Sequence, residues 1–225
     1  MKIWVISDTH GSHFLLDTPT DVDMVIHCGD CTDNFNYYTN KEEFFSFLNW
    51  YENLDIKHKV LIAGNHDQWV ENEDCIKELN STDIHYLDNE YLTIENLKLY
   101  GSPNTYQFGS RYITHAIDKK ELETSWDNLD DSIDILITHL PPFGILDMVS
   151  NASGNYRELC GCKGLLDTVR RIKPKLHCFG HIHNDSITIN QGIRVIDNTT
   201  FVNASCVTNG ISFKMKVSNG IIINI

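Results

Sequence analysis

Metal-ligating side chains follow five apolar runs of this sequence, at the point where each run ends. The polar clusters are SDTHG, CGDCTDN, GNHDQ, THLPP and GHIHND, which begin at positions 7, 28, 64, 138 and 180. The candidate side chains in them are Asp8, His10, Asp30, Asn65, His66, Asp67, His139, His181 and His183. Carboxylate, imidazole and amide oxygen donors suit divalent cations such as Mn, Fe, Zn or Co, and no thiolate is required. These residue types therefore predict metal chemistry.

The number of candidate ligands predicts two ions rather than one. Six or more ligands exceed the four of a tetrahedral site, and one carboxylate can bridge two ions through its two oxygens. Asp8 and His10 are two residues apart, so along an extended backbone both side chains point the same way, and His181 and His183 share that spacing. Pairs of metal ions about 3.5–4 Å apart recur in phosphate-ester hydrolysis. The pattern therefore predicts a binuclear hydrolase.

The apolar runs that precede the clusters predict the elements that position them. Residues 2–7, 23–29 and 58–64 have the pattern of buried strands. Segment 40–54 has apolar residues at helical spacing, and Asn40 is its expected N-cap. We expect parallel strands joined by a crossover helix. Ligands in open α/β sheets bind at the carboxyl ends of strands, so the five clusters should meet at one rim.

The rest of the chain continues an α/β pattern. Further strands are predicted at 84–87, 90–102, 133–139 and 175–180, and helices at 118–129 and 161–172. Segments 186–205 and 211–225 have the pattern of antiparallel strands, with Asn219 and Gly220 as a hairpin signal. No repeat or linker divides the sequence, so we expect a single domain over residues 1–225.

Charge and cysteine content limit the partners and the compartment. The formal net charge of −13 disfavours nucleic acid, because such binding depends on Lys and Arg side chains that neutralise phosphates. The N-terminal MKIWVISDTHG lacks the apolar region of a signal peptide, and no apolar run approaches the roughly 18 residues of a membrane span. Seven cysteines, an odd number, favour reduced thiols over a disulfide framework. We expect a cytoplasmic protein with no membrane partner.

The order of the motifs carries a resemblance to a known family. Asp-x-His, Gly-Asp, Gly-Asn-His-Asp, Thr-His and Gly-His-x-His follow one another between residues 7 and 183. In this order they resemble the five blocks of the calcineurin-like metallophosphoesterase superfamily. Segments 101–103, 133–147 and 161–183 also resemble the small metallophosphoesterase-domain-containing (class III type) phosphodiesterases. The resemblance implies an α/β fold, a four-layer αββα sandwich with two mixed β-sheets flanked by helices, and two divalent metal ions, with Mn favoured.

The same resemblance implies a role for each candidate residue. Asp8, His10 and His183 would hold the first ion, Asp30 would bridge, and Asn65, His139 and His181 would hold the second. His66 would contact a phosphoryl oxygen and stabilise charge or protonate the leaving oxygen, and Asp67 would orient His66. The implied reaction is in-line attack of a hydroxide held between the ions. Some members of the closer branch have glycine at the position of His181 and lose metal affinity, so the histidine here implies an active enzyme.

The other histidines and the cysteines have structural interpretations. The histidines outside the motifs are His13, His27, His58, His85, His115 and His177. We expect them to be structural or surface residues, with His27 and His177 buried in strands. Cys28 and Cys31 have C-x-x-C spacing, but no second pair matches it, so we expect Cys28 to be a core residue.

Aromatic residues and polar loops offer candidate substrate contacts. Phe44, Phe45 and Phe47 are expected in a helix core, whereas Tyr37 and Tyr38 leave two interpretations open, a cover for a loop or a base-stacking surface. The polar loops 104–111 and 151–157 are candidates for substrate contacts. Arg111 or Arg157 could pair with a phosphate, although a solvated arginine is the preferred interpretation of each.

The expected function is phosphodiester hydrolysis, with a small substrate such as a cyclic nucleotide or an aryl phosphodiester. One alternative is a phosphomonoesterase or protein phosphatase that uses the same site. A nuclease is disfavoured by the acidic charge. Another alternative is a metal-binding scaffold with little turnover that works through protein partners. The intact ligand set favours an enzyme, because a scaffold has no need of His66 beside Asn65.

Overall fold

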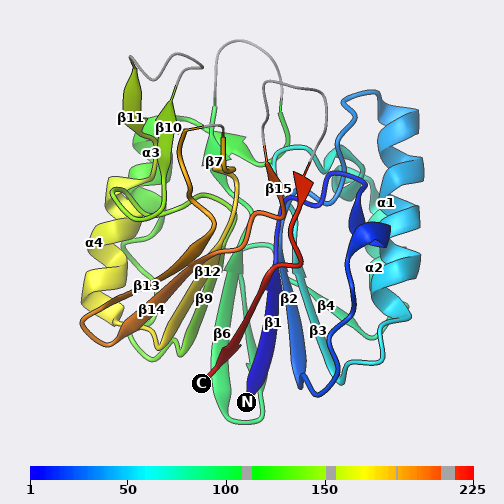
Figure 1. The fold of residues 1–225 in the computed structure, drawn as a ribbon, viewed down its shortest axis with the longest axis horizontal. Coiled ribbons are helices and arrows are strands. Elements are labelled where there is room, and N and C mark those ends of the chain that lie inside the picture. Colours follow the sequence, from blue (N-terminus) through cyan, green and yellow to red (C-terminus); the bar gives the residue numbers. More distant parts are fainter. Residues whose placement is uncertain (108–112, 151–155, 186, 209–215) are drawn as a thin grey trace.

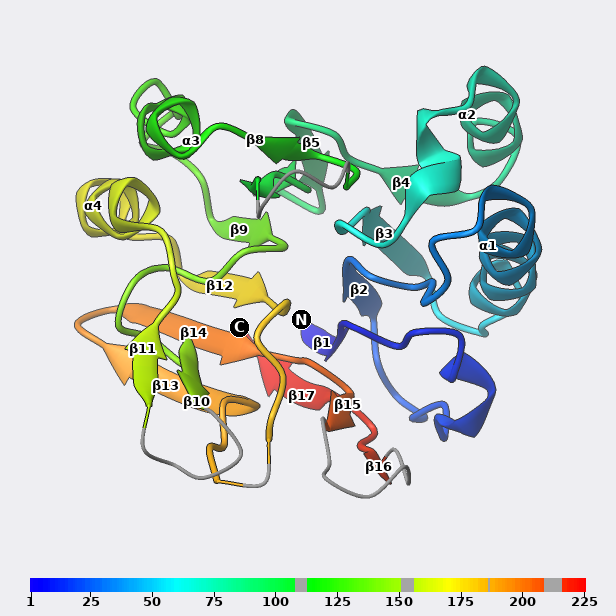
Figure 2. The same ribbon diagram turned by 90° about the horizontal axis from the view of Figure 1, so that it is seen from above.

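Two β-sheets pack face to face between two pairs of helices, which gives the chain four layers (Figures 1 and 2). The computed structural model describes residues 1–107, 113–150, 156–185, 187–208 and 216–225. Helices α1 and α2 cover the outer face of one sheet, and α3 and α4 cover the outer face of the other (Figure 2). The expected αββα sandwich of two mixed sheets is confirmed.

The first sheet contains the N-terminal strands and the C-terminal strand. In spatial order its strands are β17 (Ile221–Asn224), β1 (Lys2–Ile6), β2 (Met24–Cys28), β3 (His58–Ile62) and β4 (Ile84–Tyr86). Strands β1 to β4 are parallel, and β17 pairs antiparallel with β1. Helix α1 (Tyr37–Glu52) connects the parallel neighbours β2 and β3, so the predicted crossover helix is confirmed.

The second sheet has a parallel centre and two antiparallel edges. In spatial order its strands are β13 (Gly192–Ile196), β14 (Thr199–Asn203), β12 (Leu176–Phe179), β9 (Ile135–Thr138), β6 (Leu97–Ser102) and β5 (Glu90–Ile94). Strands β14, β12, β9 and β6 are parallel, while β13 and β5 are antiparallel to their neighbours. The strand predicted at 90–102 is therefore two strands. Glu95 and Asn96 form the turn between them, with φ angles of 48° and 69°.

Shorter elements complete the described part of the chain. The remaining helices are α2 (Glu73–Leu79), α3 (Lys119–Ser125) and α4 (Lys163–Ile172), and the 3-10 helices are η1 (His13–Leu15) and η2 (Gln68–Glu71). Three two-stranded sheets pair β7 (Thr105–Tyr106) with β8 (Ala116–Ile117), β10 (Met148–Ser150) with β11 (Arg157–Leu159), and β15 (Val207–Thr208) with β16 (Lys216–Val217). Helix α3 is shorter than predicted: it begins after the N-cap Asp118 and ends at Ser125. No helix in the described ranges is long and apolar enough to cross a bilayer.

Three apolar clusters fill the spaces between the four layers. Because side chains alternate along a strand, Trp4 of β1 faces helix α1 and packs near Phe47, whereas Val5 faces the second sheet. The third cluster lies between the second sheet and helices α3 and α4, where Leu136 packs near Leu165. Each fully buried large apolar side chain contributes about 1.5–3 kcal/mol. These contacts hold the strand ends at fixed positions.

The N-cap of helix α1 lies four residues earlier in the chain than Asn40, the predicted N-cap. Asn36 is the N-cap, and its side-chain oxygen accepts hydrogen bonds from the backbone N–H groups of Tyr38 and Thr39. Asn40 lies inside the helix and is fully buried. The prediction was wrong because both asparagines satisfy the same local capping rule, and only tertiary contacts assign them different roles.

Asn219 and Gly220 do not form the predicted hairpin. The strand before them, β16, pairs with β15, whereas β17 after them pairs with β1 in the first sheet. Gly220 has a φ of 68°, and a Cβ atom added at this position would collide with the carbonyl oxygen of Val5. Glycine is therefore required here because the chain changes direction, and not because it forms a hairpin. Asn219 instead accepts a hydrogen bond from the N–H of Asp17, 2.7 Å away.

Candidate metal centre

The five polar clusters lie at the carboxyl ends of five strands drawn from both sheets. Strands β1, β2 and β3 of the first sheet and β9 and β12 of the second end next to them. The N–H of Ser7 donates to the carbonyl of Ala204 at 3.1 Å, which joins the two sheets at this rim. The expected convergence of the clusters therefore occurs in the structure.

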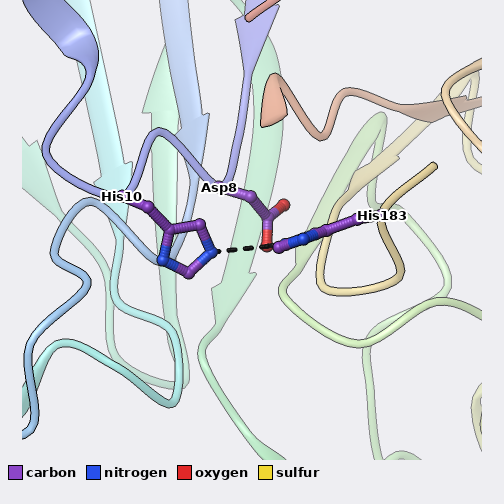
Figure 3. A group of neighbouring side chains, drawn as sticks. All are labelled: Asp8, His10 and His183. Carbon is purple, nitrogen blue, oxygen red and sulfur yellow. Dashed lines mark hydrogen bonds and ion pairs between the residues drawn. The ribbon is translucent and has the colours of Figure 1, made fainter. Parts of the chain in front are cut away.

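The first group of candidate ligands consists of Asp8, His10 and His183, whose ligand atoms all lie within 4.8 Å of one another (Figure 3). His183 Nε2 is 3.3 Å from His10 Nε2 and 3.0 Å from Asp8 Oδ1. The other oxygen of Asp8 accepts hydrogen bonds from the hydroxyl of Ser205 at 2.8 Å and the backbone N–H of His181 at 3.0 Å. Asp8 is therefore held at one oxygen and directed toward the histidines at the other.

The second group consists of Asp30, His139 and His181, again within 4.8 Å. His139 Nε2 lies 3.2 Å from Asp30 Oδ2 and 3.1 Å from the side-chain oxygen of Asn65. The two histidines of GHIHND thus belong to different groups, although only one residue separates them. Left-handed backbone at His181, with a φ of 66°, breaks the extended geometry that would turn both side chains the same way.

The carboxylate of Asp30 lies between the two groups. Its Oδ2 atom is 3.2 Å from His139 Nε2 in the second group and 3.9 Å from His10 Nε2 in the first. The same oxygen is 4.0 Å from His66 Nε2, and Oδ1 accepts a hydrogen bond of 2.8 Å from the His66 backbone N–H. One carboxylate is therefore within reach of both groups and of His66.

One chain segment, residues 28–33, sets the orientation of three site histidines. In each case the ring Nδ1 atom contacts a backbone carbonyl of this segment. The pairs are His10 with Thr32 at 3.0 Å, His66 with Asp33 at 3.0 Å and His139 with Cys28 at 2.7 Å. A carbonyl can only accept, so Nδ1 carries the proton and Nε2 faces the site. The segment thus aims three imidazole nitrogens at one space.

The donor set of the second group fits a bound cation. When neutral His139 donates its Nδ1 proton to Cys28, its Nε2 atom is an acceptor that faces two more acceptors, on Asp30 and Asn65. A positive charge has to lie among them. Burial lowers the pKa of His139, but the charge of Asp30 outweighs burial and raises the pKa to about 9. In the absence of a metal ion, a protonated His139 therefore supplies the positive charge. The residues therefore fit a divalent metal.

Two buried carboxylates at the centre remain charged. Burial raises the pKa of Asp8, but nearby His183 outweighs burial, and the pKa is lowered. Burial likewise raises the pKa of Asp30, and His139 and His66 lower it well below its ordinary value. Both groups therefore offer negative charge to cations.

The Asp67 carboxylate makes no hydrogen bond to the His66 imidazole in the described part of the chain, so the predicted orienting role would act through a loop. Its fully buried carboxylate accepts hydrogen bonds from the loops that follow β2 and β3. The donors are the backbone N–H groups of Gly64 at 2.9 Å, Thr32 at 2.9 Å and Cys31 at 3.3 Å, the Thr32 hydroxyl at 2.9 Å and the Cys31 thiol at 3.2 Å. Asp67 therefore fixes Cys31 and Thr32 in this loop. The residue after them, Asp33, contacts the His66 ring through its backbone carbonyl. Asp67 acts on the imidazole only through that loop.

Asn40 makes a second connection to the same loop, which the sequence reasoning missed. Its side-chain N–H₂ group donates to the Thr32 hydroxyl at 2.8 Å, the Asn34 carbonyl at 2.8 Å and the His66 carbonyl at 2.7 Å. Its oxygen accepts from the N–H of Trp69 at 2.9 Å. An asparagine beside a helix start gave only a capping signal, so these contacts had no signature in the sequence.

Several candidate ligands have left-handed backbone conformations. The φ angles are 51° for Asp8, 42° for His10, 57° for Asp30 and 66° for His181. Such conformations are uncommon for residues other than glycine, and each costs on the order of 1 kcal/mol or more. The fold therefore imposes the directions of these side chains at a local cost.

Strand histidines support the ligand-bearing loops from within the sheets. His27 of β2 is fully buried, and its Nδ1 atom accepts a hydrogen bond from the N–H of Gly29 at 3.2 Å. Its Nε2 atom is therefore the donor toward the hydroxyl of Thr9, 3.1 Å away. Thr9 lies between Asp8 and His10, so this bond links the end of β1 to β2.

The second sheet repeats the arrangement. The hydroxyl of Thr138 donates to the carbonyl of Leu140 at 2.7 Å, so it accepts from His177 Nε2 at 2.9 Å. Thr138 precedes His139, and His177 belongs to β12, which leads to His181. Burial lowers the pKa of both His27 and His177 to about 3, so both are neutral. Their predicted burial in strands is confirmed.

The remaining predictions concern thiols, aromatic residues and loops. All seven cysteines are free, and Cys28 is fully buried, as predicted. Phe44 and Phe47 belong to the core beside α1, whereas Tyr38 is exposed. The ring of Phe35 lies 4.3 Å from that of His66, a contact that the sequence gave no reason to expect. Arg111, half of the loop 104–111 and most of the loop 151–157 lie outside the described residues.

Comparison with known proteins agrees with the motif order. A model of the calcineurin-like phosphoesterase family matches residues 1–185. A UPF0046 protein of Caenorhabditis elegans is 32% identical over 219 residues, which cover 91% of this chain and 69% of that protein. Human metallophosphoesterase domain-containing protein 1 is 33% identical over 227 residues, which cover 90% of this chain and 65% of that protein. The chain spans about two thirds of the length of these relatives.

A solved structure shows the same fold at low identity. The crystal structure of a phosphopantetheinyl hydrolase from Mycobacterium tuberculosis has a TM-score of 0.57 and 14% sequence identity, and the match covers 91% of this chain and 88% of that one. Such a likeness extends to the arrangement of the sheets and helices.

Proposed function

This chain belongs to the calcineurin-like phosphoesterase family, and from that premise we propose that it is a binuclear metal-dependent phosphodiesterase of small phosphodiesters, such as cyclic nucleotides. The observation that carries the proposal is the position of Asp30. Its carboxylate lies between two groups of metal-ligating side chains, 3.2 Å from His139 Nε2 and 3.9 Å from His10 Nε2. A carboxylate so placed can serve two cations at once.

The ligand groups support a specific assignment of residues to ions. Asp8, His10 and His183 would hold the first ion, Asn65, His139 and His181 the second, and Asp30 both. The donors are oxygen and imidazole nitrogen, which suit Mn, Fe, Zn or Co, and Mn is our preferred ion. Bound cations of this kind offset phosphoryl charge and lower the pKa of water.

In our proposal His66 acts on the substrate rather than on a metal, while its ligand atom also lies within 4.8 Å of those of His10 and Asp33. Its Nδ1 proton is engaged by the carbonyl of Asp33, so Nε2 faces the site beside Asp30. A proton on Nε2 can donate to a phosphoryl oxygen or pass to the leaving oxygen. The ring of Phe35 lies beside the imidazole, with the two ring centroids 4.3 Å apart.

A diester substrate suits the charges of the site better than a monoester. In the described part of the chain, the ion pairs of Asp8 and Asp30 come from histidines only. A monoester dianion is commonly bound by arginine in a bidentate contact, whereas a diester carries a single charge. The overall charge of −13 also opposes a nucleic acid substrate, so we favour small molecules.

Hydrolysis of bis(p-nitrophenyl) phosphate with added Mn²⁺ tests the proposal. We expect metal-dependent release of p-nitrophenol by the wild type and its loss in Asp30→Ala. Asp74→Ala is the matched control, because it removes an exposed carboxylate of α2 whose one ion pair among the described residues is with Lys77. Hydrolysis by Asp30→Ala at the wild-type rate would contradict the role of Asp30. Faster turnover of p-nitrophenyl phosphate than of the diester would favour a phosphomonoesterase, and no turnover of either would favour a scaffold.

A further inference from the structure

Strand β13 is an uncovered edge of the second sheet. It pairs with β14 on one side, and in the described ranges no strand lies on its other side (Figure 2). Natural proteins usually protect such an edge with charges, proline, a bulge or a covering segment, because unpaired N–H and C=O groups attract other strands. The edge of β13 carries a single charged residue, Arg194.

The turn that follows β13 shows which backbone groups are unpaired. A two-residue turn joins Ile196 to its partner Thr199, so this closing pair exchanges ladder hydrogen bonds. Bonded and non-bonded pairs alternate along an antiparallel ladder, so Arg194 is bonded to β14, whereas Ile193 and Val195 direct their N–H and C=O groups outward. No described residue bonds to these outward groups. They form a template for one more strand.

The side chains around this edge are apolar and exposed. Val195 is 68% exposed and Ile193 50%, and Ile189 beside the strand is 79% exposed. Ile189 also lines a cavity with Ile187 and Leu159, on the opposite, helix-facing side of the strand, where Arg194 lies. Large exposed apolar residues are ordinary when scattered, but a cluster along a free strand marks an interaction surface.

The helix-facing side of β13 borders two cavities that are lined by basic residues. One cavity of about 270 Å³ is lined by Arg194 and Arg157, and the other, of about 330 Å³, by Arg170 and Lys173. Of these four residues, only Arg170 has an ion pair with a described residue, at 3.7 Å from Asp167. The acidic residues that line the cavities are Asp147, which is buried, and Asp197.

The local charge balance is opposite to that of the whole chain. Four basic and two acidic residues line the cavities, whereas the chain has 18 Lys and Arg residues against 31 Asp and Glu residues. A partner that brings acidic side chains to this side of the strand would meet unpaired cations at short range.

We propose that β13 is a docking edge for an extended acidic segment of another protein, which adds to the sheet as an antiparallel strand beside Ile193 and Val195. Main-chain hydrogen bonds to the outward groups provide affinity, and the side chains provide specificity. Acidic residues at alternate positions face Arg194, and apolar residues between them cover Ile193 and Val195. The inference is independent of the reaction at the metal centre.

Self-association through the same edge is disfavoured by charge. An antiparallel pair of β13 strands related by a two-fold axis brings Arg194 of one copy opposite or diagonal to Arg194 of the other. Arg157 lines the same cavity in both copies, so four cations would gather at the interface. Like charges across strands are destabilising. The acidic segment of a different chain therefore fits better than a second copy.

Selection from a phage-displayed library of random dodecapeptides tests the proposal. We expect enrichment of peptides with Asp or Glu alternating with β-branched apolar residues. A selected peptide should slow hydrogen exchange of the Ile193 and Val195 amides, and its affinity should fall as NaCl rises. Val195→Pro removes an outward N–H without breaking the ladder to β14, and we expect at least a tenfold loss of affinity with metal-dependent hydrolysis unchanged.

Two further variants keep the test informative if Val195→Pro unfolds. Val195→Lys puts a charge on the exposed edge, and Arg194→Glu reverses the charge that faces the peptide. Both should weaken binding at least tenfold, and Arg194→Glu should shift selection toward basic peptides. Enrichment without acidic residues, or equal binding to all variants, would overturn the proposal. So would a wild-type dimer in light scattering that Val195→Lys dissociates, because a second copy would then cover the edge.

Discussion

The Nδ1 atom of His66 lies 3.0 Å from the backbone carbonyl oxygen of Asp33, and this carbonyl orients the imidazole. The carboxylate of Asp67, which directly follows His66 in the sequence, points away and fixes the loop that carries the carbonyl. A backbone atom of one loop and a buried acid of another therefore act together on one candidate catalytic side chain.

Asp67→Asn should lower turnover by about 10- to 100-fold, the usual effect of removing a group that supports a ligand or catalytic residue. The new N–H₂ group would face backbone N–H donors, so the free energy of unfolding should also fall by about 1–3 kcal/mol. Steady-state kinetics and thermal unfolding measure both effects. Asp74→Ala is the control, because it removes an exposed carboxylate of α2 whose ion pair among the described residues is with Lys77. Equal damage in both variants would argue against a specific role of Asp67.

His66→Ala should reduce kcat by about 10²–10⁴-fold, the range for removal of a general acid. Metal content should stay near that of the wild type, because in the proposed mechanism His66 donates to the substrate and lies outside the ligand sets. Turnover of the chromogenic diester and elemental analysis of the purified variant measure the two quantities. Loss of metal would show that His66 is a ligand.

His181→Ala and His183→Ala should damage different metal sites. His181 groups with Asp30 and His139, and His183 groups with Asp8 and His10. Calorimetric titration with Mn²⁺ should show one weakened site in each variant and one site near its wild-type affinity. Equal weakening of both sites by either substitution would contradict the separate assignment.

Gly180→Ala should displace Asp8 and weaken the first metal site. A Cβ atom at this position would contact the carboxylate of Asp8 and the hydroxyl of Ser7, both of which are buried. Gly144→Ala is a suitable control, because φ there is 80° but no atom lies near the added carbon, so the cost is backbone strain of about 1 kcal/mol. Titration with Mn²⁺ should separate the two variants. Retention of both sites in Gly180→Ala would refute the predicted displacement.

Acid should destabilise the fold through the buried strand histidines. His27 and His177 are neutral in the folded state, because burial lowers the pKa of each to about 3 from an ordinary value of 6.5. Their contribution to the free energy of unfolding is fully present above pH 6.5 and is lost as the pH falls toward 3. In this range the two histidines take up protons only in the unfolded chain. From pH 7 to pH 5, each histidine should cost about 2 kcal/mol.

Urea unfolding of wild type and His177→Phe at pH 7 and pH 5 tests this expectation. The decrease in the free energy of unfolding between the two pH values should be about 2 kcal/mol smaller in the variant, because one buried neutral histidine is removed. An identical decrease in both proteins would show that His177 takes up its proton in the folded state.

The sequence alone determined the parallel strands and the rim of this protein. Alternation within buried strands such as β1 follows from the two-residue period of a strand, and the order of parallel strands around a crossover helix follows from the spacing of apolar segments. Each cluster of polar residues was visible at a strand end. Hence the convergence of the candidate ligands, from Asp8 to His183, was predictable before any contact was known.

Tertiary structure decided which atoms meet at that rim. The side chains of His181 and His183 point to different ligand groups because the backbone at His181 is left-handed. The spacing of the two residues in the sequence cannot reveal this conformation. Asn40 and Asp67 satisfy local patterns, yet their partners lie in loops that only the packed sheets bring near. Hydrogen bonds between distant segments depend on positions in space, so only the folded chain shows that the carbonyl of Asp33 orients His66.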